Sequence, residues 1–169
     1  MENEPLEIER KFLIRMPSED ILRRMAEKRI EICQVYLCRE EDQGSRRIRC
    51  SRWNGGEVYH YNEKIRLTDR TRIEREREIT REEFDRLREE ADPQRRPVEK
   101  VRWCIPYAGH TLELDVFPFW QRQAFCEAEL SREDEELLLP EWIEVIREVT
   151  EDHRYNNNSL ARTIPEEEA

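Results

Sequence analysis

Residues 6–14 read Leu6-Glu7-Ile8-Glu9-Arg10-Lys11-Phe12-Leu13-Ile14. At the two-residue period of a β-strand, Glu7, Glu9 and Lys11 share one face, and the apolar residues at positions 6, 8, 12 and 14 share the other. Side chains two apart on a strand face lie about 6.5–7 Å from each other. Glu7 and Glu9 are then close enough to share a divalent cation, and Lys11 to meet an anion held by it. An isolated pattern of this kind is more often an ordinary solvated strand face, so both interpretations stay open here.

The composition favours one domain with charge inside it. The chain has 169 residues, which predicts a single domain over 1–169, with a disordered acidic tail at 165–169. Charged residues make up 41% and hydrophobic residues 37%, but the charges alternate with apolar residues instead of forming blocks. A fold that lines part of its interior with charge is therefore expected. The net charge of −10 argues against non-specific binding to nucleic acid.

The five cysteines and the N-terminal residues indicate the cellular compartment of the protein. An odd number of cysteines without C-x-x-C spacing indicates neither a complete disulfide framework nor a zinc site, and fits a reducing compartment. The opening residues, MENEPLEIER, lack the basic and apolar regions of a signal peptide, and no later run of about 18 apolar residues could span a bilayer. We expect a cytoplasmic protein without a membrane or nucleic-acid partner.

The remaining pattern predicts an α+β protein of about eight strands, with helices between some of them. Asn54-Gly55-Gly56 signals a hairpin turn. Helices are predicted from Pro17-Ser18 to Ile30, after the capping box Thr80-x-x-Glu83, and as a short turn after Ser131-x-x-Asp134. The run Arg72 to Ile79 is predicted to be a strand because a new helix cap follows it.

The charged strand faces are sorted by sign. Acidic pairs are Glu7/Glu9, Glu113/Asp115 and Glu127/Glu129; basic pairs are Arg47/Arg49 and Lys100/Arg102, with Lys64 and Arg72 as single additions. If the sheet closes into a barrel of about eight strands, its interior is just wide enough for side chains or one small ligand. Carboxylates without a cysteine or histidine cluster select hard cations such as Mg²⁺ or Mn²⁺. Arginine and lysine at strand spacing suit neighbouring phosphate oxygens. A polyanion with a bound divalent metal would satisfy both signs.

In this order the motifs resemble those of the CYTH superfamily, the triphosphate tunnel metalloenzymes, over residues 6–163. The matching motifs are Glu7-Ile8-Glu9-Arg10-Lys11, Arg47-x-Arg49, Lys64, Arg72-x-Glu74-x-Glu76, Glu99-Lys100-x-Arg102, Glu113-Leu114-Asp115-Val116, Glu127-x-Glu129 and Asp152-x-Arg154-Tyr155. The chain is most similar to the compact bacterial members. The resemblance implies an eight-stranded antiparallel closed β-barrel with flanking helices, which binds a triphosphate with divalent metal, Mg²⁺ or Mn²⁺.

The resemblance also implies a role for each matching residue. The implied metal ligands are Glu7, Glu9, Asp115, Glu127 and Glu129. The implied phosphate-binding residues are Arg47, Arg49, Lys64, Arg72, Lys100, Arg102 and Arg154. Lys11 matches a catalytic lysine near the scissile phosphate, and Tyr36 matches a tyrosine that pairs with it. Glu74 and Glu76 are interpreted as bridges between arginines. At 156–158, three asparagines stand where some relatives carry lysine, which weakens the expectation of a C-terminal phosphate contact.

The leading functional hypothesis is metal-dependent hydrolysis of inorganic triphosphate or a similar short linear triphosphate. Its motivation is the Tyr36/Lys11 match and a short chain without an insertion that would recognise a base. The alternatives are a class IV-type adenylyl cyclase, a thiamine or nucleoside triphosphatase, and a non-catalytic polyphosphate-binding module. Small members of the family often form dimers, so the resemblance also implies a homodimer.

Overall fold

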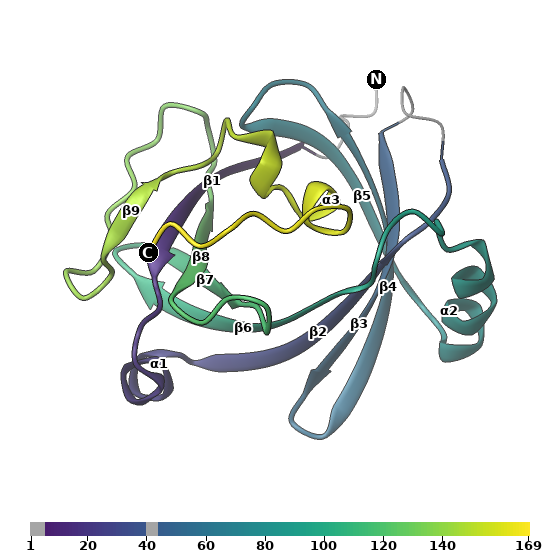
Figure 1. Ribbon diagram of the computed structural model, residues 1–169, viewed down its shortest axis with the longest axis horizontal. Helices are drawn as coiled ribbons and strands as arrows, with labels where there is room; N and C mark the ends of the chain where they lie inside the picture. Colours follow the sequence, from purple (N-terminus) through teal and green to yellow (C-terminus); the bar gives the residue numbers. More distant parts are fainter. Residues whose placement is uncertain (1–5, 40–43) are drawn as a thin grey trace.

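Nine antiparallel strands of a single sheet form the framework of the computed structural model, which describes residues 6–39 and 44–169 (Figure 1). The strands are β1 Leu6–Arg15, β2 Lys28–Tyr36, β3 Ser45–Trp53, β4 Gly56–Arg66, β5 Thr71–Ile79, β6 Val98–Tyr107, β7 His110–Val116, β8 Gln123–Glu129 and β9 Val145–Glu148. Their order is β5-β4-β3-β2-β6-β7-β8-β1-β9, and β5 also pairs with β1. This last pairing closes β1 to β8 into an eight-stranded barrel, so the predicted fold is confirmed.

Strand β1 is the seam of the barrel. One of its edges pairs with β8 from Glu9 to Arg15. The other edge pairs first with β5, where Leu6 lies opposite Ile73, and further along with β9, where Phe12 lies opposite Glu148. Strand β9 therefore pairs with the part of this edge of β1 that β5 does not reach. The sequence pattern did not predict β9, which is only four residues long.

The turn between β3 and β4 has the backbone geometry that its sequence demands. Asn54 has φ 51° and Gly55 has φ 74°. Two successive residues with positive φ make the tight hairpin turn whose twist matches that of the flanking strands, and Asn-Gly adopts it at little cost. The predicted hairpin is confirmed.

The helices are short and lie outside the strands or across one end of the barrel. They are α1 Glu19–Met25, α2 Arg81–Leu87 and α3 Asn157–Leu160, with the 3₁₀ turns η2 Arg88–Glu90 and η3 His153–Tyr155. The predicted cap of α2 is present, since Thr80 Oγ1 accepts a hydrogen bond of 3.1 Å from the Glu83 backbone N–H. None of the described helices is long and apolar enough to cross a membrane.

Two of the predicted helices need correction. The first was expected to reach Ile30, but α1 ends at Met25, because from Lys28 onward the chain pairs with β6. The short helix expected after Ser131 does not form in the described structure. The Ser131 backbone N–H donates instead to the Glu135 carboxylate at 2.5 Å, and Leu137 packs in an irregular segment against the apolar outer wall of the barrel.

Most of the apolar core lies outside the barrel wall, because the inner face carries the charges. One cluster around Trp103, Leu114 and Cys126 packs beneath α1 and the segment 131–143, and a second around Ile48 packs beneath α2 through Phe84. A third cluster lies inside the barrel. Its members include Leu13, Tyr36, Val98, Phe117, Trp120, Phe125 and Tyr155. This cluster forms an apolar floor, and the C-terminal segment crosses the barrel there (Figure 1).

The acidic residues at the C-terminus contact other parts of the chain. The Pro165 carbonyl accepts a hydrogen bond of 2.9 Å from Trp120 Nε1. The Glu167 carboxylate accepts 2.6 Å bonds from the backbone N–H groups of Gln121 and Arg122, and Glu168 pairs with an arginine of β9. The acidic residues of the tail therefore satisfy backbone and arginine donors that lie far away in the sequence.

Candidate active site

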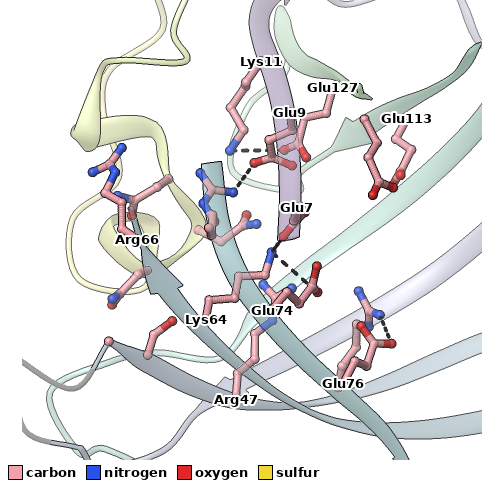
Figure 2. A pocket seen from close by; sticks show the side chains of 18 of the residues that line it. Glu7, Glu9, Lys11, Arg47, Lys64, Arg66, Glu74, Glu76, Glu113 and Glu127 are labelled. Carbon is pink, nitrogen blue, oxygen red and sulfur yellow. Dashed lines mark hydrogen bonds and ion pairs between the residues drawn. The ribbon is translucent and has the colours of Figure 1, made fainter. Parts of the chain in front are cut away.

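A polar cavity of about 430 Å³ lies inside the barrel above the apolar floor (Figure 2). Side chains alternate between the two faces of a strand, so every second residue of the charged strands points into it. It is lined by Glu7, Glu9, Lys11, Tyr36, Gly44, Ser45, Arg47, Arg49, Lys64, Arg66, Arg72, Glu74, Glu76, Arg102, Glu113, Glu127, Glu129, Asn156, Asn157 and Asn158. The structure thus brings most of the predicted site residues together, and adds Arg66, Glu113 and the asparagines.

The cations of the cavity face its carboxylates. Lys11 Nζ lies 3.1 Å from Glu127 Oε1, and the two residues are directly opposite each other on β1 and β8. Lys64 Nζ lies 3.0 Å from Glu7 Oε2, and Arg72 donates to Glu9 (Figure 2). Strand register sets the first pair, whereas Arg72 lies opposite Glu7 and donates to Glu9, and Lys64 reaches Glu7 from a strand that does not pair with β1. Together these pairs make the wall of the cavity nearly neutral.

Lys11 is held at the boundary between the cavity and the apolar floor. Its side chain is 8% exposed, and its ammonium donates a 3.1 Å hydrogen bond to the Tyr155 carbonyl. It also lies 4.7 Å from the centre of the Phe125 ring, where a cation is attracted to the π-face. Tyr36, the predicted partner of Lys11, lines the same cavity and contacts Arg47, which lies opposite it on β3. The Lys11–Tyr36 pairing stays a prediction.

Lys100, Asp115 and Arg102 form a buried triad of charged side chains. Asp115 Oδ2 accepts from Lys100 Nζ at 2.8 Å and from Arg102 Nη2 at 3.0 Å, while Oδ1 accepts from Arg102 Nε at 2.8 Å. The side chains of Lys100 and Asp115 are fully buried. Neither is among the residues that line the cavity, and their predicted roles as a phosphate contact and a metal ligand stay predictions. Asp115 orients Arg102, whose Nη1 also pairs with Glu113 at the cavity wall.

The charge states of the triad follow from burial and mutual attraction. Burial lowers the pKa of Lys100 to about 8, against the raising effect of Asp115. Burial alone would raise the pKa of Asp115, but Arg102 and Lys100 outweigh it and hold this pKa well below its ordinary value. Asp115 is therefore a carboxylate at every pH at which the protein is expected to work, and Arg102 stays fixed in one orientation.

Gln34 is a site residue that the sequence interpretation missed. It is fully buried on the inner face of β2, and its Oε1 accepts a 2.6 Å hydrogen bond from Arg47 Nη1. This bond aims the Arg47 guanidinium along the cavity wall. The sequence position of Gln34 could have identified it, because it lies two residues before Tyr36 and therefore on the same strand face.

Arg154 is the predicted phosphate-binding residue that the structure places elsewhere. Its side chain is 68% exposed, and its Nη2 lies 2.7 Å from Asp152 Oδ2. Asp152 also accepts from the Arg154 backbone N–H at the start of η3, which holds the guanidinium close to its own backbone. The asparagines that follow do line the cavity, and the Oδ1 atoms of Asn157 and Asn158 are buried without a hydrogen-bond partner among the described residues.

The carboxylates of β1 and β8 have the donor chemistry of a hard-cation site. Burial raises the pKa of Glu129, and repulsion by Glu7, Glu74 and Glu9 raises it further. The buried Glu7 Oε2 and Glu127 Oε1 accept no hydrogen bond from the described residues, although each faces an ammonium. A cation would relieve this excess of acceptors. Within the described ranges no three acidic, histidine or cysteine side chains converge closely enough to hold a metal, because these carboxylates turn toward Lys11, Lys64 and Arg72.

Comparison with solved structures shows close relatives of this barrel. The crystal structure of the hypothetical protein NE1496 is 30% identical, covers 94% of this chain and 99% of its own, and superimposes with a TM-score of 0.57. A crystal structure of the inorganic triphosphatase NE1496 gives 28% identity, 95% and 97% coverage, and a TM-score of 0.55. PH1819 from Pyrococcus horikoshii OT3, at 23% identity, 76% and 80% coverage and a TM-score of 0.56, shares the fold. No family model and no curated protein matches the chain.

A closed antiparallel barrel with paired acids and bases on its inner wall defines a tunnel-type barrel protein. Together with the near full-length similarity to NE1496, it assigns the family. The chain belongs to the CYTH superfamily, the triphosphate tunnel metalloenzymes.

Proposed function

We propose that the protein hydrolyses inorganic triphosphate, or a similar short linear triphosphate, with Mg²⁺ or Mn²⁺ as cofactor. The observation that carries the proposal is the pairing of acidic and basic side chains around the cavity. A triphosphate with its divalent cation would exchange partners with these pairs. The lysines and arginines would turn to phosphate oxygens and the carboxylates to the cation, so that no charge is left uncompensated.

The shape and polarity of the cavity favour a substrate without a ring system. Its volume of about 430 Å³ is at the small end of the range for ligand pockets. Tyr36 is the one aromatic side chain among the described lining residues, and it is held in the apolar floor beside Phe117 and Phe125. A purine or thiazole ring would find no apolar platform on the charged wall. This supports inorganic triphosphate over ATP or thiamine triphosphate.

The cationic residues would bind the phosphate chain in a fixed position. Arg47 and Arg102 are pre-oriented by Gln34 and Asp115, so little rotamer entropy is lost when they meet phosphate oxygens. Lys11 has three N–H donors, of which the Tyr155 carbonyl takes one, so donors remain for an oxygen of the phosphate that is cleaved once Glu127 turns to the metal. Charge that develops on that phosphate would be stabilised by groups already in place.

The metal would be held by Glu7, Glu9, Glu127 and Glu129, the carboxylates of β1 and β8 that line the same cavity, once they turn from the cations that face them in the structure. When bound, it would supply a water of lowered pKa and neutralise charge on the phosphates. The relative NE1496, described as an inorganic triphosphatase, supports this proposal at 28% identity.

The experiment compares phosphate release from inorganic triphosphate, ATP and thiamine triphosphate with Mg²⁺, with Mn²⁺ and with EDTA. We expect the highest kcat/KM for inorganic triphosphate, with phosphate and diphosphate as products, and no turnover in EDTA. Lys11→Met should lower turnover at least about 100-fold. The matched control is Lys28→Met, which lies away from the cavity against Trp53 and should leave turnover unchanged. A preference for ATP with cyclic AMP as product would overturn the proposal, and so would binding without any turnover.

A further inference from the structure

Two cysteines lie opposite each other on the outer wall of the barrel. Cys33 on β2 and Cys50 on β3 are register partners, and both line a groove of about 530 Å³ that α2 and parts of β4, β6 and β7 also border. Both thiols are free. Cys50 belongs to the outer cluster beneath α2, and neither cysteine lines the charged cavity, so the proposed function does not use these thiols.

The backbone geometry of this pair permits a bridge. The Leu37 backbone N–H donates to the Arg46 carbonyl at 3.0 Å, which makes Leu37 and Arg46 a hydrogen-bonded pair. Hydrogen-bonded and non-hydrogen-bonded pairs alternate along an antiparallel ladder. Cys33 and Cys50 are four residues further along each strand and are therefore also a hydrogen-bonded pair. Such partners have Cα atoms about 5.5 Å apart, inside the range of about 4.4–6.8 Å that disulfides span.

We propose that Cys33 and Cys50 are an oxidation site at which a peroxide produces a cross-strand disulfide. The Cys33 thiolate, the more exposed of the two, attacks one peroxide oxygen, the O–O bond breaks, and a sulfenic acid and a water are formed. The Cys50 sulfur then attacks the Cys33 sulfur and the S–O bond breaks, releasing a second water. In sum, two thiols lose two electrons and two protons, and one hydrogen peroxide is reduced to two waters.

The surroundings make this reaction slow enough to require sustained peroxide. Burial raises the pKa of the Cys33 thiol, Glu99 raises it further, and Arg88 opposes them. Burial and Glu57 raise the pKa of Cys50, against Arg52. Little thiolate is therefore present at neutral pH, and the pair stays reduced under ordinary exposure.

Formation of the disulfide would displace side chains inside the barrel. Hydrogen-bonded partners have Cβ atoms up to about 5.5 Å apart, whereas a disulfide needs about 3.5–4.5 Å, so closure draws β2 and β3 together by up to about 1 Å. The next register pair is Gln34 and Arg49, and Gln34 also holds Arg47. Closure would shift the two arginines that are proposed to bind phosphate. This consequence rests on the proposed function, whereas the formation of the bridge does not.

The first test maps the bridge chemically. The protein carries Cys38→Ser, because Cys38 is exposed and would link separate molecules. It is treated with hydrogen peroxide, alkylated and mapped by mass spectrometry without reduction. We expect one linked peptide pair that contains Cys33 and Cys50 and is lighter by two hydrogens, and dithiothreitol should separate it. Cys104→Ser, the matched control on β6, should still form the bridge. Cys33→Ser should not. Absence of this linked pair, or over-oxidation of each cysteine alone, would overturn the proposal.

The second test measures the consequence separately. Oxidised protein should show a KM for inorganic triphosphate raised about tenfold or more, because small displacements of positioned groups have large effects. Dithiothreitol should restore the original KM, and Cys33→Ser should be insensitive to peroxide. A mapped bridge with an unchanged KM would overturn the coupling to the cavity. A protein that forms the bridge but never turns over any triphosphate would contradict the proposed function and leave the oxidation site intact.

Discussion

Replacement of Asp115 by asparagine tests whether this residue orients Arg102 or binds metal. In the structure both Asp115 oxygens are occupied by Lys100 and Arg102, and its side chain is fully buried. Asp115→Asn keeps the shape and removes the charge. Two buried cations then face each other with only Glu113 left to neutralise one of them.

The expected loss of stability is large. Removing one partner of a buried ion pair costs about 3–5 kcal/mol. The lower end, about 3 kcal/mol, applies because Lys100 can release its proton and Arg102 keeps Glu113. For a chain of this length that corresponds to a decrease in Tm of about 6–12 °C. Turnover should fall as well, because Arg102 is no longer held in one orientation.

The loss should depend on pH in a defined direction. Burial lowers the pKa of Lys100 to about 8 from 10.5, and Asp115 opposes this decrease, so Asp115→Asn should lower the Lys100 pKa further. Between that lowered pKa and 10.5 the unfolded variant binds more protons than the folded one, and its stability rises with pH. The wild type has this dependence only above about pH 8. The difference between the two proteins should therefore decrease from about pH 6 to about pH 8.

The assay is thermal unfolding in EDTA at several pH values, together with titration of Mn²⁺ into the folded protein. The matched control is Glu148→Gln, which breaks a half-exposed pair with Arg10 and should cost less than about 1 kcal/mol. Adding Lys100→Met to Asp115→Asn should restore part of the lost stability, since an apolar side chain can pack there against Phe117. An unchanged Tm with lost Mn²⁺ binding would refute the reasoning and make Asp115 a metal ligand.

Two further predictions concern the carboxylates of the cavity and the outer core. Burial and neighbouring carboxylates raise the pKa of Glu129, so Glu129→Gln should raise the Tm in EDTA at neutral pH while lowering turnover. The rise should be at most about 2 °C, because Glu129 is exposed and solvent screens the repulsion. The wild type regains stability as the pH falls through this raised pKa, so the difference in Tm between the variant and the wild type should vanish in acid. A variant that is less stable than the wild type at neutral pH would contradict the repulsion between Glu129 and its neighbours. Leu114→Ala, at a fully buried position of β7, should cost about 3 kcal/mol in urea unfolding, and a loss below about 1 kcal/mol would contradict the packing of this wall.

The strands of the barrel were readable from sequence because the two-residue alternation is a local signal. Glu7, Glu9 and Lys11 share a strand face whatever they pair with, and the same holds for Arg47 and Arg49. Since most of the strands have a charged face, and a closed barrel gathers these faces on its inner wall, the cavity could be anticipated from the pattern together with the family resemblance.

The same alternation could not predict which residues of a charged face are buried and which line the cavity. Glu113 and Asp115 are equivalent in the pattern, but the register of β6 and β7 places Asp115 opposite Arg102 and Glu113 opposite Cys104. Only this pairing buries Asp115 and leaves Glu113 at the cavity. Arg154 was misplaced for a similar reason, because its partner Asp152 lies two residues away and holds it outside.

Local helix signals also failed where tertiary contacts outweighed them. The capping pattern after Ser131 is present in the sequence, yet Leu137 and Leu139 pack against the outer wall from an irregular segment. The acidic tail finds partners in the backbone of residues 121–122, which no local pattern could indicate.

The most direct measurement of the central claim is phosphate release from inorganic triphosphate by the wild type and by Lys11→Ala, each with Mg²⁺ or Mn²⁺ and with EDTA. The proposed function predicts metal-dependent release of phosphate by the wild type, and its loss in a Lys11→Ala variant that is still folded, with a lowered Tm because Glu127 loses its buried partner. Folded wild-type protein that releases no phosphate with either metal would contradict it.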